Sequence, residues 1–306
     1  MTLLVVLDQQ DDGDFNHSIW GDGTYLYVAC ANSGIRAYTF DGTNFALKGS
    51  GDDGNGYYWV WGDGTYIYVT CLTEGIRAYT FDGTNFALKG SQDDGGSYIG
   101  VWGDGTYIYT TCQEDGIRAY TFDGTNFTLK DTQDDGDYYN GVWGDGTYIY
   151  VCCRGDGIRA YTFDGTNFAL KDTQDDGDIY IGVWGDGTYI YTTCFGSGIR
   201  AYTFIGENFV LAGSRDDGGN YVGVWGDGNY IYAVGSDGDG GIRAYTFDGT
   251  NFTLIDRQLP LPPVGGFDSD NVWGDGKYIY LACEEDGIRA YDTIKAWAAF
   301  PSIRCT

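Results

Sequence analysis

The chain has 306 residues, and its 44 acidic side chains outnumber its 17 lysines and arginines, which gives a formal net charge of -27. This excess of negative charge repels nucleic acids and anionic membrane surfaces, so we expect neither as a partner. Proteins and small neutral or cationic ligands are the partners that the charge allows.

The N-terminus carries no recognisable targeting segment. The residues from Met1 to Asp8 include no basic group and too few apolar residues for a secretory signal peptide. No stretch of the sequence is long and apolar enough to form a transmembrane helix. We therefore expect a soluble protein, and the unpaired cysteine pattern described below favours the cytoplasm.

One line of sequence is repeated along the whole chain, and it is clearest from Gly62 to Trp102. Tryptophan marks the register of the copies. The first five intervals between these markers are 41 residues long and the last is 48. The markers are Trp20, Trp61, Trp102, Trp143, Trp184, Trp225 and Trp273.

Each copy predicts four short β-strands, which we expect in the clearest copies at 66–71, 76–81, 86–90 and 98–102. Apolar and polar residues alternate in these segments, and Asp-Gly turn sequences separate them, which is a strong hairpin signal. No segment within the repeats has a helical period. Most of the acidic residues are the aspartates of these turns, so the negative charge has a structural origin.

Four antiparallel strands repeated seven times at this period predict an all-β fold, a closed seven-bladed β-propeller. The last copy lacks a fourth strand, whereas the N-terminal segment 6–13 aligns with segment 170–177, which contains one. We therefore expect the N-terminal strand to complete the last blade of a single domain spanning residues 1–306, which removes exposed sheet edges. In the tail, residues 292–306, we expect Asp292 to cap a short helix that runs through Ala299, ends before Pro301 and packs on the ring.

The repeat also resembles a known family. The line Val-Trp-Gly-Asp-Gly-Thr-Tyr-Ile-Tyr at 101–109, followed by Asp-Gly-Ile-Arg-Ala-Tyr at 115–120, is similar to the repeats of LVIVD-repeat β-propellers. This resemblance implies a propeller fold, a surface or secreted location and no defined activity. The tryptophan in the first strand, the repeated cysteine and the missing secretion signal depart from the family pattern. These departures argue against a surface or secreted location for this chain.

Cysteine and arginine recur at fixed positions of the repeat. Six of the eight cysteines are Cys30, Cys71, Cys112, Cys153, Cys194 and Cys283. Equivalent positions of a ring lie too far apart for disulfides, so we interpret these residues as small buried hydrophobic side chains. The repeated arginines are expected to pair with repeat aspartates; they are Arg36, Arg77, Arg118, Arg159, Arg200, Arg243 and Arg289.

Two sets of positions vary between copies, and the propeller topology places both on one face. The first set lies three residues before each marker tryptophan and consists of His17, Tyr58, Ile99, Asn140, Ile181, Val222 and Asp270. The second is the loop before each Gly-Ile-Arg, at 31–33, 72–74, 113–115, 154–156, 195–197, 236–240 and 284–286. A binding surface and neutral drift of tolerant loops are two explanations of this variation.

We place the candidate ligand-binding site where the last blade meets the first. The only histidine, His17, and Asp270 occupy equivalent positions in these two blades. The candidate ligand-binding residues are Asn16, His17, Tyr58, Trp59, Asn140, Asp268 and Asp270. No catalytic residue is assigned, because no nucleophile is identifiable beside His17.

The sequence leaves three functions open. The first is a non-enzymatic binding or scaffold propeller, expected to be a monomer, that holds a protein or small ligand on the variable face. The second is a multivalent lectin with equivalent sites between blades, and the third is a cation-assisted hydrolase or lactonase. No cofactor is identified, although Asp-rich loops such as 11–14 allow a weakly bound cation such as calcium.

Overall fold

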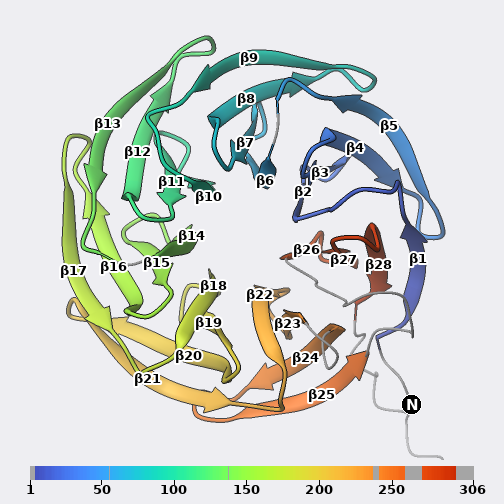
Figure 1. Ribbon diagram of the computed structural model, residues 1–306. Coiled ribbons are helices and arrows are strands. Elements are labelled where there is room, and N and C mark those ends of the chain that lie inside the picture. The colour runs from blue at the N-terminus through green and yellow to red at the C-terminus, as the bar shows by residue number, and fades with distance from the viewer. Residues whose placement is uncertain (1–3, 55, 137, 237–240, 259–270, 294–306) are drawn as a thin grey trace, which may run out of the picture.

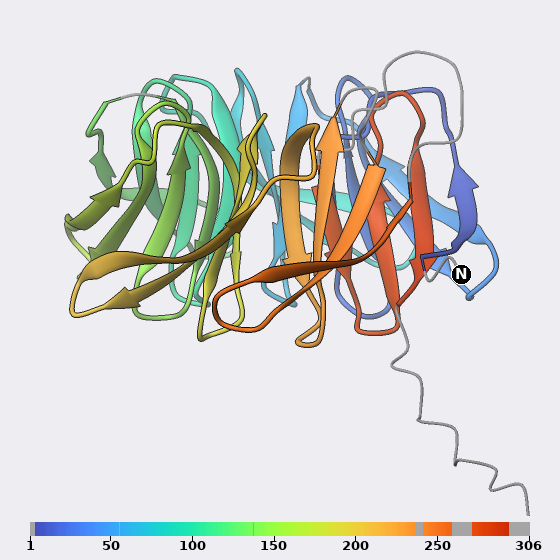
Figure 2. The same ribbon diagram turned by 90° about the horizontal axis from the view of Figure 1, so that it is seen from below.

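The structure is a computed structural model, and it describes residues 4–54, 56–136, 138–236, 241–258 and 271–293. All regular elements of these residues are β-strands, numbered β1 to β28. Figure 1 shows the strands grouped into blades around a common centre, and Figure 2 shows them running between the two faces of the ring. The predicted all-β fold of four-stranded antiparallel blades is confirmed.

Four consecutive strands form each of four sheets. The first sheet contains β2 (Ser18–Gly21), β3 (Leu26–Cys30), β4 (Gly34–Phe40) and β5 (Phe45–Gly51), and the second contains β6 (Tyr57–Gly62), β7 (Ile67–Cys71), β8 (Gly75–Phe81) and β9 (Phe86–Gln92). The third contains β10 (Tyr98–Gly103), β11 (Ile108–Cys112), β12 (Gly116–Phe122) and β13 (Phe127–Gln133). The fourth contains β14 (Tyr139–Gly144), β15 (Ile149–Cys153), β16 (Gly157–Phe163) and β17 (Phe168–Gln174).

Two further groups of four strands are joined into one sheet because Phe195 of β19 pairs with Asn220 of β22. This sheet contains β18 (Ile179–Gly185), β19 (Ile190–Phe195), β20 (Gly198–Ile205), β21 (Asn208–Arg215), β22 (Asn220–Gly226), β23 (Ile231–Ser236), β24 (Gly241–Phe247) and β25 (Phe252–Gln258).

The remaining sheet joins the two ends of the chain. Its strand order is β1 (Val6–Gln10), β28 (Ile288–Asp292), β27 (Tyr278–Ala282) and β26 (Asn271–Gly274). The N-terminal strand β1 lies antiparallel to β28, with Gln10 opposite Ile288. The N-terminal strand therefore supplies the outer strand of this blade, as the alignment of segment 6–13 predicts. The helix predicted in the tail lies outside the described residues.

An aspartate fixes the turn after each innermost strand. In the turn between β6 and β7, Oδ1 of Asp63 accepts the backbone N–H groups of Thr65 and Tyr66, each at 2.8 Å. Its second oxygen, Oδ2, accepts the hydroxyl of Tyr68 at 2.9 Å. Gly64 follows with φ +89°, a left-handed conformation that favours glycine. The Asp-Gly pair is constant because both residues have conformational roles.

The marker tryptophans hold neighbouring blades together. Trp20 stacks on Tyr27 of its own blade, with ring centroids 6.0 Å apart, and its outer edge contacts Gly62 of the next blade. A Cβ at Gly62 would lie 2.6 Å from this ring, so only glycine fits. The same contact joins Trp61 to Gly103, Trp102 to Gly144, Trp143 to Gly185, Trp184 to Gly226, Trp225 to Gly274 and Trp273 to Gly21.

The repeated cysteines and arginines form a second layer of packing. Within the described residues all seven cysteines are buried and none forms a disulfide, as predicted. Arg159 shows the arrangement, since one guanidinium nitrogen donates to Sγ of Cys153 at 3.1 Å and the other contacts Oδ2 of Asp156 at 2.7 Å. Similar ion pairs with an acidic side chain are formed by Arg77, Arg118, Arg200 and Arg289. The predicted pairing of repeat arginines with acidic residues is thus observed. The acid belongs to the variable loop in four of these pairs, whereas Arg200 pairs with Asp178, which precedes β18.

The first prediction tests the tryptophan contact. Gly144→Ala places a methyl group 2.6 Å from the ring of Trp102, so we expect a loss of about 1–3 kcal/mol in the free energy of unfolding. Urea unfolding followed by tryptophan fluorescence measures this change. The control is Thr147→Ala, an exposed position in the next turn, which should leave the stability unchanged. Equal unfolding midpoints for the two variants would contradict the proposed close packing.

The second prediction concerns thiol chemistry. Burial raises the pKa of Cys71 and Cys194 to about 11, and that of Cys112 to about 12, so these thiols are protonated and enclosed at pH 8. In a Cys305→Ser variant, which removes the cysteine outside the described residues, a thiol reagent should label no cysteine of the folded chain. In denaturant the same reagent should label all seven remaining cysteines. Rapid labelling of the folded chain would be inconsistent with this burial.

Candidate functional site

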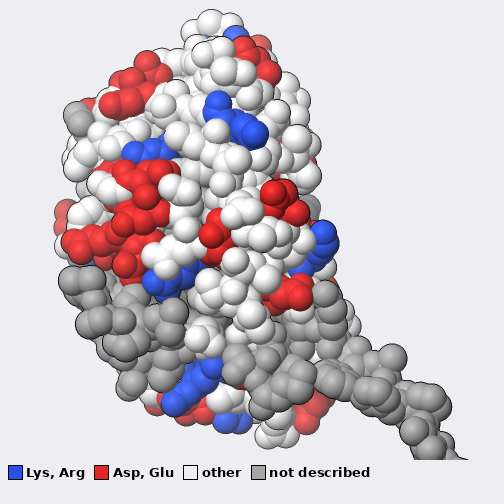
Figure 3. All heavy atoms as spheres, turned by 90° about the vertical axis from the view of Figure 1, so that its right-hand side faces the viewer, with Lys and Arg blue, Asp and Glu red and all other residues white. Residues whose placement is uncertain are grey.

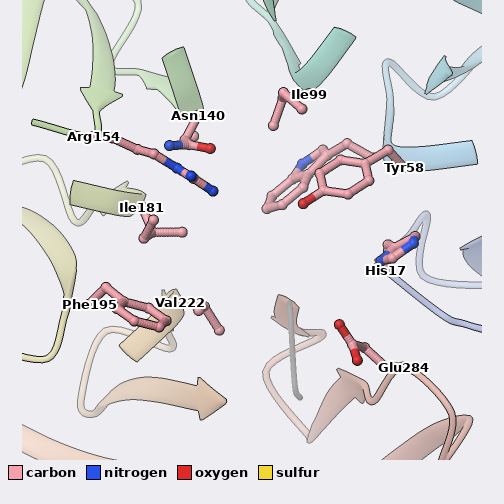
Figure 4. Close-up of a pocket in the computed structure, with 11 residues that line it drawn as sticks. His17, Tyr58, Ile99, Asn140, Arg154, Ile181, Phe195, Val222 and Glu284 are labelled. Atoms are coloured by element: carbon pink, nitrogen blue, oxygen red, sulfur yellow. The ribbon is translucent and has the colours of Figure 1, made fainter. Parts of the chain in front are cut away.

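A pocket of about 210 Å³ lies at the centre of the ring, near the ends where the innermost strands begin. Figure 4 shows side chains from several blades converging on this space. Nearly all of them come from the two variable sets of the repeat. The lining of this cavity is therefore drawn mainly from positions that vary between copies of the repeat.

The first variable set supplies one side chain from six of the seven innermost strands, or from the residue before the strand. These side chains belong to His17, Tyr58, Ile99, Asn140, Ile181 and Val222. Each position lies three residues before a marker tryptophan. The tryptophan contact that joins the blades therefore also fixes the backbone position from which each of these side chains extends. The seventh member, Asp270, lies outside the described residues.

The second set contributes Arg154, Phe195 and Glu284, each the first residue of a variable loop. Their backbones bridge neighbouring blades. The N–H of Arg154 donates to the carbonyl of Tyr138 at 2.9 Å, and its carbonyl accepts from Tyr180 of the next blade at 3.0 Å. Because the backbone makes the structural contacts, the side chain at this position can change without loss of the bridge.

The same bridge occurs where the last blade meets the first. Glu284 and Asn16 exchange two backbone hydrogen bonds, each 3.1 Å long. Glu284 has φ +27°, a conformation uncommon for a residue other than glycine. Its half-buried side chain points toward the pocket in Figure 4.

The pocket combines an aromatic wall, an aliphatic wall and two opposite charges. The rings of His17 and Tyr58 lie 4.8 Å apart between centroids, and Trp59 extends this wall. Ile99, Ile181 and Val222 supply aliphatic surface. Arg154 and Glu284 stand on opposite sides of the space, as Figure 4 shows. This composition suits an amphipathic ligand better than a purely apolar one.

Asn140 is the most enclosed polar side chain of the pocket, with 7% of its surface exposed. Its Nδ2 group has no hydrogen-bond partner among the described residues. A buried amide with unused hydrogen-bonding capacity lowers stability by about 1–3 kcal/mol, and a ligand that bonds to it recovers part of this loss. Asn140 therefore marks the side of the pocket near Arg154 as a polar contact point.

The structure brings together some of the residues selected from sequence. His17, Tyr58, Trp59 and Asn140 line the pocket. Asn16 is buried and does not line it; its backbone bridges to Glu284 and its Oδ1 accepts the thiol of Cys30 at 3.2 Å. Asp268 and Asp270, the other two selected residues, lie outside the described residues.

Sequence reasoning did not select Ile99, Ile181, Val222, Arg154, Phe195 and Glu284 as site residues. All six belong to the variable positions noted in the sequence, so the signal was present. The predicted site was centred on the junction of the last and first blades, and it therefore did not include these side chains, which reach the same space from other positions in the ring.

The opposite end of the innermost strands presents a different surface. A shallow depression there is lined by constant residues of the repeat, such as Trp102, Asp104, Trp143 and Asp145. The described residues contain no group of three or more His, Cys, Asp or Glu side chains placed to hold a metal ion. Where the structure is described, it also has no helix able to cross a membrane.

Comparisons with known proteins support the fold and do not identify a family. No family model matches the sequence, and no curated protein matches it. The LVIVD resemblance therefore has no support from a family model.

Solved structures do match the architecture. A WD40 β-propeller domain of Doa1 is 10% identical, with a TM-score of 0.71, and the match covers 98% of this chain and 100% of that one. A chain of a mitotic checkpoint complex is 11% identical, with a TM-score of 0.79 and 96% of each chain covered. The computationally designed protein Ika8 is 7% identical, with a TM-score of 0.65 and coverage of 95% and 100%. The chain thus shares a β-propeller fold with these proteins.

Proposed function

We propose that this chain is a closed, seven-bladed, non-enzymatic binding propeller that holds a protein or a small neutral or cationic ligand in the pocket lined by His17, Asn140 and Glu284. The ring closure is supported by the pairing of β1 with β28 and by the contact of Trp273 with Gly21. The LVIVD-like line remains a resemblance in sequence. A monomer in the cytoplasm is the form we expect, without a resident cofactor.

The convergence of the variable positions carries this proposal. Constant residues make the turns, the tryptophan contacts and the blade cores, whereas nine variable residues line one cavity. Drift alone accounts for variation at tolerant positions but not for a cavity with opposite charges and an aromatic wall. A scaffold that keeps its backbone and changes its loop side chains is a common basis for binding sites.

The structural neighbours agree with a binding role. One is a WD40 domain, and another belongs to a mitotic checkpoint complex, so that propeller occurs in a protein assembly. Protein binding is consequently the role we favour for this chain. The hydrolase alternative stays a prediction, because its His17–Asp270 pair includes a residue outside the described part.

A lectin is the second candidate, because equivalent small clefts occur between adjacent blades. Two of them are lined by Trp143 with Tyr150 and by Trp184 with Tyr191, each about 70 Å³ in volume. A tryptophan and an aspartate recur in both, which suits stacking and hydrogen bonding to a sugar. A glycan array distinguishes the two functions, since several equivalent sites per chain favour a lectin and one site or none favours the scaffold.

The third prediction tests the pocket directly. Val222→Trp and Ile181→Trp fill the cavity, so we expect each variant to lose binding of fragments that the parent protein binds in a ligand-observed NMR screen. Thr147→Trp, which adds the same side chain on the opposite face, should retain this binding. Far-ultraviolet circular dichroism verifies the fold of each variant. Fragment binding that survives both filled-pocket variants would place the binding surface elsewhere.

A further inference from the structure

The class of ligand follows from the charges of the pocket, and this inference rests on the proposed binding function. At the first position of the variable loops the sequence has Ala31, Leu72, Gln113, Arg154, Phe195, Ser236 and Glu284. Two of these seven residues are charged, they have opposite signs, and both line the pocket. Their backbones are fixed by the bridges between blades, so the two charges are held apart at defined places.

Arg154 differs from the repeated arginines of the blade interiors. Its guanidinium lies 5.7 Å from the ring centroid of Tyr138, whose hydroxyl donates to Glu114 at 2.6 Å. Among the described residues, no carboxylate lies within 4.0 Å of the Arg154 guanidinium. A planar guanidinium supported on one face by an aromatic ring is well suited to bind a carboxylate. The amide of Asn140 on the same blade adds hydrogen-bonding capacity.

The Glu284 side has the complementary chemistry. The carboxylate of Glu284 faces the space that His17 and Tyr58 border (Figure 4), and Trp59 also lines the pocket. A cationic side chain placed there is attracted by the carboxylate and by the faces of the aromatic rings. Acidic patches on the outer surface, visible in Figure 3 among fewer basic groups, raise the local concentration of cationic segments.

Apolar surface separates the two charged sides. Ile99 is buried with 6% exposure, whereas Val222 and Ile181 are half-buried, and all three line the cavity between the charges. Phe195 is 39% exposed and lies beside Val222 in Figure 4. A ligand that reaches both charges therefore passes over aliphatic surface.

We propose that the pocket binds a peptide segment of a partner protein that carries a basic and an acidic side chain separated by apolar residues. The basic side chain lies beside Glu284 and the aromatic wall, and the acidic side chain contacts Arg154 and Asn140. The opposite charges orient the peptide, because the reversed direction places like charges together.

The fourth prediction is tested with a random dodecapeptide library selected on the immobilised full-length chain. Selected peptides should be enriched in one basic and one acidic residue at a constant spacing. The dissociation constant of the best peptide, measured calorimetrically at fixed salt, should rise about tenfold or more in Arg154→Gln and in Glu284→Gln. Matched controls are Lys130→Gln and Glu285→Gln, two exposed charges outside the pocket, which should change it little.

A charge exchange makes the test specific. Arg154→Glu should lose the original peptide and bind the version in which its acidic residue is replaced by lysine. Peptides that bind without paired charges, or that bind both glutamine variants as tightly as the controls, would overturn the ligand class. If such peptides still fail to bind Val222→Trp, the proposed pocket function stands and only this inference fails. If no peptide binds the parent chain, both the protein-binding function and this inference are wrong.

Discussion

The contact between each marker tryptophan and a glycine of the next blade is the constraint on which this structure depends. A flat ring lies against a backbone that has no room for a side chain, as with Trp61 on Gly103. The stacking of the same ring on a tyrosine fixes its orientation, with centroids of Trp61 and Tyr68 5.9 Å apart. Each blade is therefore positioned by its neighbour, and neither residue can vary without disturbing both blades.

This constraint explains where variation is tolerated. In the blade of β6 to β9, Asp63 satisfies backbone N–H groups of the turn, the second strand β7 is wholly buried, and the outer strand β9 pairs with the third strand β8. The first residues of five variable loops, Ala31, Leu72, Gln113, Arg154 and Glu284, bridge neighbouring blades through backbone hydrogen bonds. Nine side chains from these two sets of positions line the pocket, and they are ones that a repeated sequence can change at low structural cost.

Much of the fold could be predicted from the sequence. The tryptophan spacing, the Asp-Gly turns and the alternating segments predicted the four-stranded blades, and the partial repeat at residues 6–13 predicted the pairing of β1. The strand bounds differed slightly. Strand β7 begins at Ile67 because the N–H of Tyr66 donates to Asp63 within the turn, and β9 continues to Gln92, which pairs with Ile76.

The site was predicted less completely. Histidine, tyrosine and tryptophan indicated the junction of the first and last blades, and Asn140 was also predicted correctly. Arg154, which was not predicted, reaches the same cavity from the opposite part of the ring. A linear sequence shows which positions vary but not which of them face one another across a closed fold. That information comes from the bridging backbone hydrogen bonds, which place Arg154 and Glu284 around one cavity.

A crystal structure of the full-length chain with a selected peptide tests the central claim most directly, because it shows which surface holds the ligand. The account predicts peptide density in the pocket, in contact with side chains from both variable sets. Density on the constant face near Trp102 and Trp143, or along the outer strands, with the pocket open to solvent, would contradict it.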